Sequence, residues 1–490
     1  MNIRFLSIWP SSPDHPHNWP RKYKLRHLLV TCAWTFLSSF SSTATVSITP
    51  LITSTLNKHS PLPRSSNPVA TGLITTAYLF GLAAGPVLFT PLSRRYGRRR
   101  LHEGAAVLFL LFTLACGLAG SVEMLVAFRV LAGVFGSCAL AVGRVRLRDL
   151  TPPGTVEAEI VRARYTLSRV FGFAVAPVIA GGVAHVLTSW RSVFFGIVVF
   201  STVLFIFDEL LLGRTGGAHD RAETSAVHLL RARAKRMSKA TGWNHHARPD
   251  TDGRRDESTL SLWKQMLQPL YTVWFSSFLV RWYAHFACVM FALQYATLTS
   301  LVYVYGDMLG GVEALDAPGL FVGFAAGVVL GWIPCAVAER MARRKQDIRP
   351  HVMATLLGSV LSAAGFLVYS VYPVREVAGA WRLSATHVLI GAGTTAMVGP
   401  VPGLIRAKLG PATAPDAVRS FVFWKCLFAT ILPLGARQMY ARMGRREGNQ
   451  ILFWAQLGGL VVNFAFSMIY FAPRRARRAA AAAEEGEGEE

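Results

Sequence analysis

Twelve apolar stretches run through this chain of 490 residues, and each is long enough to cross a lipid bilayer. A spanning helix rises about 1.5 Å per residue, so it needs roughly 20 predominantly apolar residues. Only 16% of the residues are charged and 52% are hydrophobic. The pattern predicts an all-α membrane protein. The predicted spans are 27–51, 69–90, 101–121, 123–144, 166–188, 192–213, 268–298, 318–338, 351–372, 383–405, 417–438 and 450–472.

The basic residues are divided unevenly between the two sides of the membrane. The formal net charge is +24, which in a soluble protein would point to nucleic acid. If the N-terminus is cytoplasmic, however, the inner loops hold several times more Lys and Arg than the outer loops. This is the asymmetry that the positive-inside rule describes. We therefore expect a multi-pass protein of the cell membrane with both termini in the cytoplasm, the lipid bilayer around it and no nucleic-acid partner.

The spans fall into two sets of six. We expect a cytoplasmic tail (1–20), an N-terminal six-helix bundle (21–213), a cytoplasmic linker loop (214–264), a C-terminal six-helix bundle (265–472) and an acidic cytoplasmic tail (473–490). The segments 91-PLSRRYGRRR-100 and 334-PCAVAERMARRK-345 both place basic residues after the second span of a half. The positive-inside rule alone could produce this likeness. The likeness nevertheless favours two pseudo-repeats. Secondary transporters commonly bind substrate between such halves.

The chain lacks the patterns of catalytic and metal sites. It contains no HExxH, GxSxG or phosphate-binding GxxxxGK[ST] sequence and no acidic metal cluster. The six cysteines all lie within predicted spans, without the spacing of metal ligands, and are interpreted as buried thiols. We therefore expect neither an enzyme with catalytic residues nor a metal site nor a bound cofactor.

An ordered series of motifs covers roughly residues 14–475. Its members are Asn18-Trp19, Pro91-Leu92-Ser93, Tyr96-Gly97-Arg98-Arg99, Leu125, Arg129, Gly133, Gly136-Ser137, Pro177, Gly181-Gly182, Trp190-Arg191, Phe194, Glu223-Thr224, Leu229-Leu230, Ala234-Lys235-Arg236, Thr241-Gly242, Pro433, Gln438-Met439-Tyr440 and Gly444. The series resembles the major facilitator superfamily, and more narrowly the fungal twelve-spanner drug:H⁺ antiporters.

The resemblance implies the major facilitator fold of twelve helices in two six-helix pseudo-repeats. It also implies roles in conformational change for Gly97, Arg98 and Arg99 in the loop after the second span, and for Pro177, Gly181 and Gly182 in the fifth. Small residues let helices approach closely, and Pro177 removes one backbone hydrogen bond where a helix can bend. The family usually carries an acidic residue where Arg94 stands, so the charge at that position is reversed here.

Four residues in the spans are candidates for transport or proton coupling. A charged residue at membrane depth is costly and should face the bundle interior or a wet cavity. Arg129 is the family's helix 4 arginine by resemblance, although it could instead extend to the outer headgroups. Lys425 stands where the family has an arginine in helix 11. Arg281 could lie deep enough in the membrane to line the pathway. His285 could carry a proton or be structural, because histidine titrates near physiological pH.

Acidic residues are missing from the central part of every predicted span. Asp208 and Glu209 lie near the inner end of the sixth span, and Gln294-Tyr295 occupies the part of the seventh where the resemblance implies an acidic residue. This favours neutral or anionic, aromatic cargo over cationic drugs. Trp282, Tyr283, Gln294 and Tyr295 could line the substrate cavity, with core packing or lipid contact as the alternative for the aromatic residues.

These observations predict a monomeric secondary transporter. We expect proton-coupled efflux of a small organic molecule by alternating access, with the proton gradient as the driving force. An uptake permease of the same fold and a non-transporting sensor or scaffold are the alternatives. The chain lacks the long soluble domain expected of a sensor.

Overall fold

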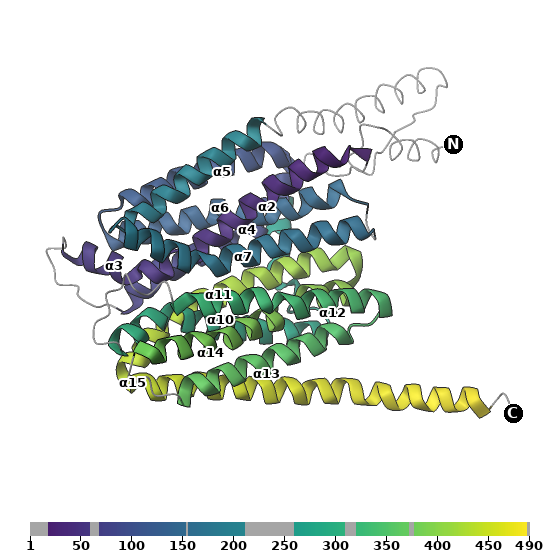
Figure 1. Cartoon of the computed structure of the whole chain (residues 1–490). Coiled ribbons are helices and arrows are strands. Elements are labelled where there is room, and N and C mark those ends of the chain that lie inside the picture. The colour runs from purple at the N-terminus through teal and green to yellow at the C-terminus, as the bar shows by residue number, and fades with distance from the viewer. Residues whose placement is uncertain are drawn as a thin grey trace, which may run out of the picture.

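The computed structural model describes residues 18–58, 68–152, 155–210, 259–308, 320–371 and 377–487, and all regular secondary structure within these ranges is helical. The first half contains α2 (Arg21–Thr43), α3 (Thr45–Lys58), α4 (Pro68–Tyr96), α5 (Arg98–Leu118), α6 (Val122–Leu150), α7 (Val156–Val186) and a helix that includes Arg191–Leu210. The second half contains α9 (Thr259–Thr272), α10 (Phe278–Met308), α11 (Leu320–Leu330), α12 (Trp332–Lys345), α13 (Arg349–Val371), α14 (Val377–Val398) and α15 (Val401–Glu487). Figure 1 shows the two halves as neighbouring bundles of roughly parallel rods.

The prediction of an all-α membrane protein is confirmed. Within the described ranges, eleven helices are long and apolar enough to cross a membrane. α2 and α3 follow one another across Ala44 and provide a further apolar helical segment. α15 comprises more than one span, because Gly410 and Gly444 leave the helical conformation within it, with φ of 73° and 79°. Glycine adopts this left-handed region without the penalty that a Cβ imposes.

The seventh span differs from its predicted limits of 268–298. α9 ends at Thr272, and α10 begins only at Phe278. The intervening residues turn, and the Ser276 hydroxyl donates a hydrogen bond to the Val273 carbonyl at 2.6 Å. Such a local bond competes with helical hydrogen bonding. Hydropathy did not reveal the turn, because the apolar sequence continues through it.

Some predicted segments lie partly outside the described residues. These are most of the 1–20 tail and positions 214–258 of the linker loop. The remainder of the predicted loop lies within α9, and the described part of the 473–490 tail belongs to α15.

A pair of glycines brings α4 and α6 into backbone contact in the first half. A Cβ on Gly133 would lie 2.2 Å from the Tyr78 carbonyl oxygen, and one on Gly81 would lie 2.0 Å from the Val130 oxygen. Real Cβ atoms do not approach this closely, so each helix requires a glycine where the other crosses it. Close approach through small residues is a common mode of packing between membrane helices.

The second half repeats this contact between α11 and α14. A Cβ on Gly327 would lie 2.2 Å from the Val388 oxygen, and one on Gly391 would lie 2.6 Å from the Phe324 oxygen. In both halves, each glycine meets the carbonyl three residues before the partner glycine. The second and fourth helices of each bundle therefore cross in the same way, which is direct structural evidence for two pseudo-repeats.

We expect Gly133→Ala to destabilise the protein. Its methyl group has no space between α4 and α6, and overpacking of this kind costs about 1–3 kcal/mol. Gly104→Ala in α5 is the matched control, because a Cβ there meets nothing within 4 Å. Alanine is the better helix former by roughly 1 kcal/mol, so the control should be neutral or stabilising. Thermal unfolding of both variants in detergent measures the difference. Equal melting temperatures would contradict the proposed backbone contact.

The bundle has one basic end. α2 begins and α15 finishes at the same end of the molecule (Figure 1). α5 begins there with three consecutive arginines, and α12 finishes there with Arg343, Arg344 and Lys345. We call it the basic end and refer to the other as the opposite end. The basic residues gathered at the basic end correspond to those of the predicted inner loops.

Candidate functional site

Aromatic side chains meet where the two halves face each other. Phe173 of α7 lies 6.2 Å from Phe291 and 6.3 Å from Tyr295 of α10, between ring centroids. It lies 6.3 Å from the ring of Phe324 in α11. Aromatic pairs at these distances contribute beyond the burial of their area. One side chain of the first half is thus surrounded by three rings of the second.

Tyr295 also joins the halves through a hydrogen bond. Its hydroxyl donates to the Ser42 carbonyl of α2 at 3.1 Å, and its ring is 1% exposed. The neighbouring Thr43 hydroxyl donates to the Phe173 carbonyl at 2.9 Å. The end of α2 is therefore hydrogen-bonded both to α7 in its own half and to α10 across the interface.

Cationic side chains lie beside this aromatic group. The Lys425 ammonium is 4.5 Å from the centre of the Phe291 ring, a cation–π distance. Arg169 of α7 and Arg144 of α6 are close enough to interact electrostatically with Lys425. None of the ion pairs found in the described residues involves any of these three cations. The interface therefore combines aromatic surface with uncompensated positive charge.

Arg129 is buried within the first half. It is 2% exposed, its guanidinium donates to the Ser41 carbonyl at 3.4 Å, and it lies 5.4 Å from the centre of the Tyr78 ring. The glycine contact between α4 and α6 places Tyr78 here, because Gly133 packs on the Tyr78 backbone one turn beyond Arg129. Arg129 thus contacts α2 and α4 inside the bundle.

Three of the residues predicted to line a cavity form contacts within the second half. Trp282 stacks on Phe466 at 4.7 Å, and the Tyr283 hydroxyl lies 2.6 Å from the Ser467 hydroxyl. The Gln294 amide donates to a carbonyl of α14, that of Ile390, at 2.7 Å. Each residue turns a helix by about 100°, so Tyr283 and Gln294 point roughly 120° and 100° away from Tyr295, and Trp282 farther still. Tyr295, by contrast, contacts the first half through its hydrogen bond to Ser42.

Arg281 and His285 lie together on α10, away from the aromatic group. The Arg281 guanidinium donates to the Trp274 carbonyl at 3.0 Å. Nδ1 of His285 is 2.6 Å from the Arg281 carbonyl, and its ring packs edge-on against Trp274 with centroids 3.9 Å apart. Both residues thus contact the turn between α9 and α10.

Charged residues connect the two halves at the basic end. Glu159 of α7 lies 2.6 Å from Arg343 of α12, and Arg162 of α7 lies 3.5 Å from Glu339 of α12. Glu339 is the centre of this group, since Arg406 also approaches it, at 3.6 Å. We call these five residues the basic-end gate. From the aromatic group toward the opposite end the halves meet through an apolar cluster instead, which includes Val46, Leu298, Leu301 and Phe321.

The predicted loop motif is positioned within the first half. Gly97 has a φ of 88° and separates α4 from α5. Arg99 pairs with Glu103 in its own helix and lies 3.1 Å from Glu209 of the sixth span. Arg98 is the first residue of α5 and is half-buried. The side chain of Arg94 lies outside the described residues.

Pro177 and Gly181 are buried in the interior of α7, and Gly182 is half-buried. A Cβ on Gly182 would meet nothing within 4 Å. Gly172 of α7 is required by a neighbouring helix, because a Cβ there would lie 2.4 Å from the Phe36 carbonyl of α2. α7 therefore packs closely on α2 at Gly172, whereas Gly182 leaves room for a Cβ.

The burial of one carboxylate near the end of a span was not predicted. Asp208 is only 7% exposed, and the Trp34 indole donates to it at 3.1 Å. Phe173, Phe291, Arg169 and the gate residues were missed as well. One signal could have found Phe291, which precedes Tyr295 by one helical turn.

Comparison with known proteins agrees with this architecture. The sequence profile of the Major Facilitator Superfamily matches residues 31–433. The chain is 26% identical over 451 residues to the efflux pump radE of Floropilus chiversii, covering 90% of this chain and 79% of that protein. It is 25% identical over 455 residues to the MFS transporter fsa7 of Fusarium sp. (strain FN080326), covering 90% and 83%.

Solved structures share the fold. The human organic anion transporter MFSD10 (TETRAN) aligns with a TM-score of 0.61 at 14% identity, covering 91% of this chain and all of that one. A mutant of the peptide transporter POT, in complex with sulfate, aligns with a TM-score of 0.62 at 15% identity, covering 94% and 96%. These likenesses support the twelve-helix arrangement of two pseudo-repeats. The chain is therefore not an enzyme but a membrane transporter that belongs to the Major Facilitator Superfamily.

Proposed function

We propose that this transporter exports a small, aromatic organic anion and is driven by the proton gradient, without a bound cofactor. The observation that carries the proposal is the group formed by Lys425, Arg169, Phe173, Phe291 and Tyr295 between the halves. It offers rings to an apolar ligand and positive charge to an acidic one.

The charge balance of this group favours an anion over a cation. Lys425 and Arg169 interact with one another electrostatically and form none of the ion pairs found in the described chain. Unpaired charge that is partly removed from water raises the free energy of the empty protein. A carboxylate or a similar anion on the ligand would relieve this repulsion through charge-assisted hydrogen bonds. A cationic ligand would increase the repulsion.

Alternating access requires that the contacts at the two ends break in turn. The basic-end gate consists of ion pairs whose side chains are about a third exposed to solvent. Water can replace such contacts at modest cost. The opposite end is held by apolar packing instead. We propose that rocking of the halves exposes the aromatic group first at one end and then at the other.

The proposed orientation places the basic end in the cytoplasm of the cell and both termini with it, as the positive-inside rule indicates. Export is favoured by the names of the relatives, among which an efflux pump is 26% identical. Proton coupling would supply the energy, since each pH unit of gradient can support roughly tenfold accumulation per proton. We propose a monomer as the functional unit.

A transport assay tests this function. Purified protein is reconstituted into vesicles and offered matched aromatic acids, neutral esters and amines, with and without an imposed pH gradient. We expect the acids to move fastest and their accumulation to rise with the gradient. Transport of the amines alone would contradict the anion preference. Rates that do not respond to the gradient would contradict proton coupling, and loading the compounds inside or outside resolves the direction.

A further inference from the structure

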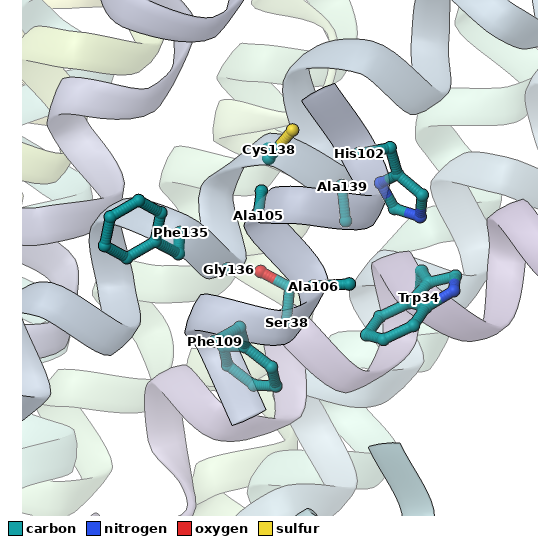
Figure 2. Close-up of a pocket in the computed structure, with 10 residues that line it drawn as sticks. All are labelled: Trp34, Ser38, His102, Ala105, Ala106, Phe109, Phe135, Gly136, Cys138 and Ala139. Atoms are coloured by element: carbon teal, nitrogen blue, oxygen red, sulfur yellow. The ribbon is translucent and has the colours of Figure 1, made fainter. Parts of the chain in front are cut away.

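A buried carboxylate and a histidine meet at the edge of a small pocket inside the first half. Nε2 of His102 in α5 lies 3.4 Å from Oδ2 of Asp208 in the sixth span, and the Trp34 indole of α2 donates to the same oxygen at 3.1 Å. Figure 2 shows the rings of His102 and Trp34 at one side of the pocket, with Phe135 at the other. Among the described residues, Asp208 is the only Asp or Glu that is buried.

We propose that His102 and Asp208 form the proton-binding site of this transporter. The inference rests on the proposed proton-driven export and names the residues that would carry the proton. In the proton-loaded form, the imidazolium of His102 would face the carboxylate of Asp208. Release of that proton would leave a neutral imidazole beside a carboxylate still held by Trp34. One proton is taken up and one released in each cycle, and no other bond changes.

Two observations distinguish this pair from an ordinary surface ion pair. His102 is 6% exposed and Asp208 is 7% exposed, so both are removed from bulk water. Nε2 of His102 has no partner that meets hydrogen-bond geometry in the described residues, although it lies within ion-pair distance of Asp208. Histidine is the side chain whose unperturbed titration falls in the physiological range. The pair therefore places a group that can bind a proton beside a carboxylate, with both residues away from bulk water.

The charged groups around the pair are few. Arg146 of α6 interacts electrostatically with Asp208. Glu209, the next residue along the sixth span, is paired with Arg99 of α5, which also binds Glu103. α6 contributes the thiol of Cys138 to the pocket, and α2 contributes Trp34 and Ser38. Asp208 therefore faces one cation, Arg146, besides the histidine that would carry the proton.

A route along α2 connects this pair with the transport interface. One turn beyond Trp34, the Ser38 hydroxyl lies 3.4 Å from that of Tyr78, whose ring contacts the guanidinium of Arg129. Farther along α2, the Ser41 carbonyl accepts a hydrogen bond from Arg129 of α6. The next carbonyl, that of Ser42, accepts the hydrogen bond from Tyr295 across the interface. A change in the Trp34–Asp208 contact would thus displace the helix that ties the halves together.

The first test needs no substrate. A protonated imidazole quenches an adjacent indole, so acidifying purified full-length protein should quench the fluorescence of Trp34. We expect part of the acid-induced quenching to disappear in Trp34→Phe and equally in His102→Gln. His185→Gln is the control, because His185 is exposed in α7 and lies apart from the pocket. Quenching that is unchanged in His102→Gln or Trp34→Phe would overturn the proposal.

The second test separates coupling from binding. Using the aromatic acid transported fastest by the wild type, we expect His102→Gln and Asp208→Asn to retain exchange of labelled for unlabelled substrate. Both should lose the roughly tenfold accumulation that each pH unit supports per proton. Asparagine keeps an acceptor for Trp34, which limits damage to the fold. A merely structural pair would lose exchange and accumulation together, and that result would overturn the proposal.

The two failures can be told apart. Wild-type transport that ignores the gradient would overturn proton-driven export, and the inference with it. If accumulation by the wild type rises with the gradient, and accumulation by His102→Gln and Asp208→Asn rises equally, only the inference about the proton-binding site is overturned.

Discussion

Replacing Lys425 with methionine should reduce transport of an aromatic acid by about ten- to a hundredfold. The ammonium lies against Phe291, beside Arg169, and forms none of the ion pairs found in the described chain. A hydrogen bond to a charged group contributes about 1.5–3 kcal/mol, and each 1.4 kcal/mol corresponds to a factor of ten. Methionine keeps the length and apolar stem of the side chain but removes the charge.

The same substitution should leave the melting temperature of the empty protein unchanged or raise it. Removing an uncompensated cation relieves its repulsion from Arg169 and Arg144. Lys408→Met is the control, because Lys408 is exposed in α15, and it should change neither quantity. Lys425→Arg should retain part of the transport. If Lys425→Met transports the acid as fast as the wild type, Lys425 does not bind the anion.

Reversing the charge of Arg343 should open the basic end. In Arg343→Glu, the new carboxylate would face both Glu159 and Glu339, so attraction across the gate becomes repulsion. The side chains are about a third exposed, which limits the effect to roughly 1–2 kcal/mol, or a five- to thirtyfold shift toward the open state. We expect a membrane-impermeant thiol reagent, applied at the basic end, to label Val170→Cys faster by this factor.

Val170 is a suitable reporter because it lies on α7 beyond the gate and packs against the apolar cluster between the halves. The native cysteines are replaced beforehand. The matched control is the charge swap Glu159→Arg with Arg343→Glu, which restores that pair and should slow the labelling. Equal labelling of the single and double variants would show that the Glu159–Arg343 pair does not hold the basic end closed.

Hydropathy alone was sufficient to predict that the chain crosses the membrane repeatedly as helices. A bilayer requires helices of a minimum length with their backbone groups satisfied internally, so the apolar stretches had few structural alternatives. The turn between α9 and α10 escaped this reasoning, because a local turn stabilised by Ser276 leaves the hydropathy of the segment almost unchanged.

The candidate site was predicted less completely, because it depends on how each helix is rotated. Tyr295, Gln294, Tyr283 and Trp282 share one apolar helix, and nothing in their sequence says which of them faces the other half. The packing of α10 against α14 and α15 turns three of them inward and leaves Tyr295 to reach Ser42. Arg169 went unnoticed for the same reason, although it is as basic as Arg129.

The sequence by itself determined that the chain crosses the bilayer repeatedly as helices in two sets of six, because hydrophobic length and the burial of backbone polar groups act locally along the chain. Tertiary structure alone decided which side chains meet. The Lys425–Phe291 contact, the Glu159–Arg343 gate and the His102–Asp208 pair join residues that are far apart in sequence. Their partners depend on helix rotation and crossing, which are set by packing between helices such as the contact of Gly81 with Gly133.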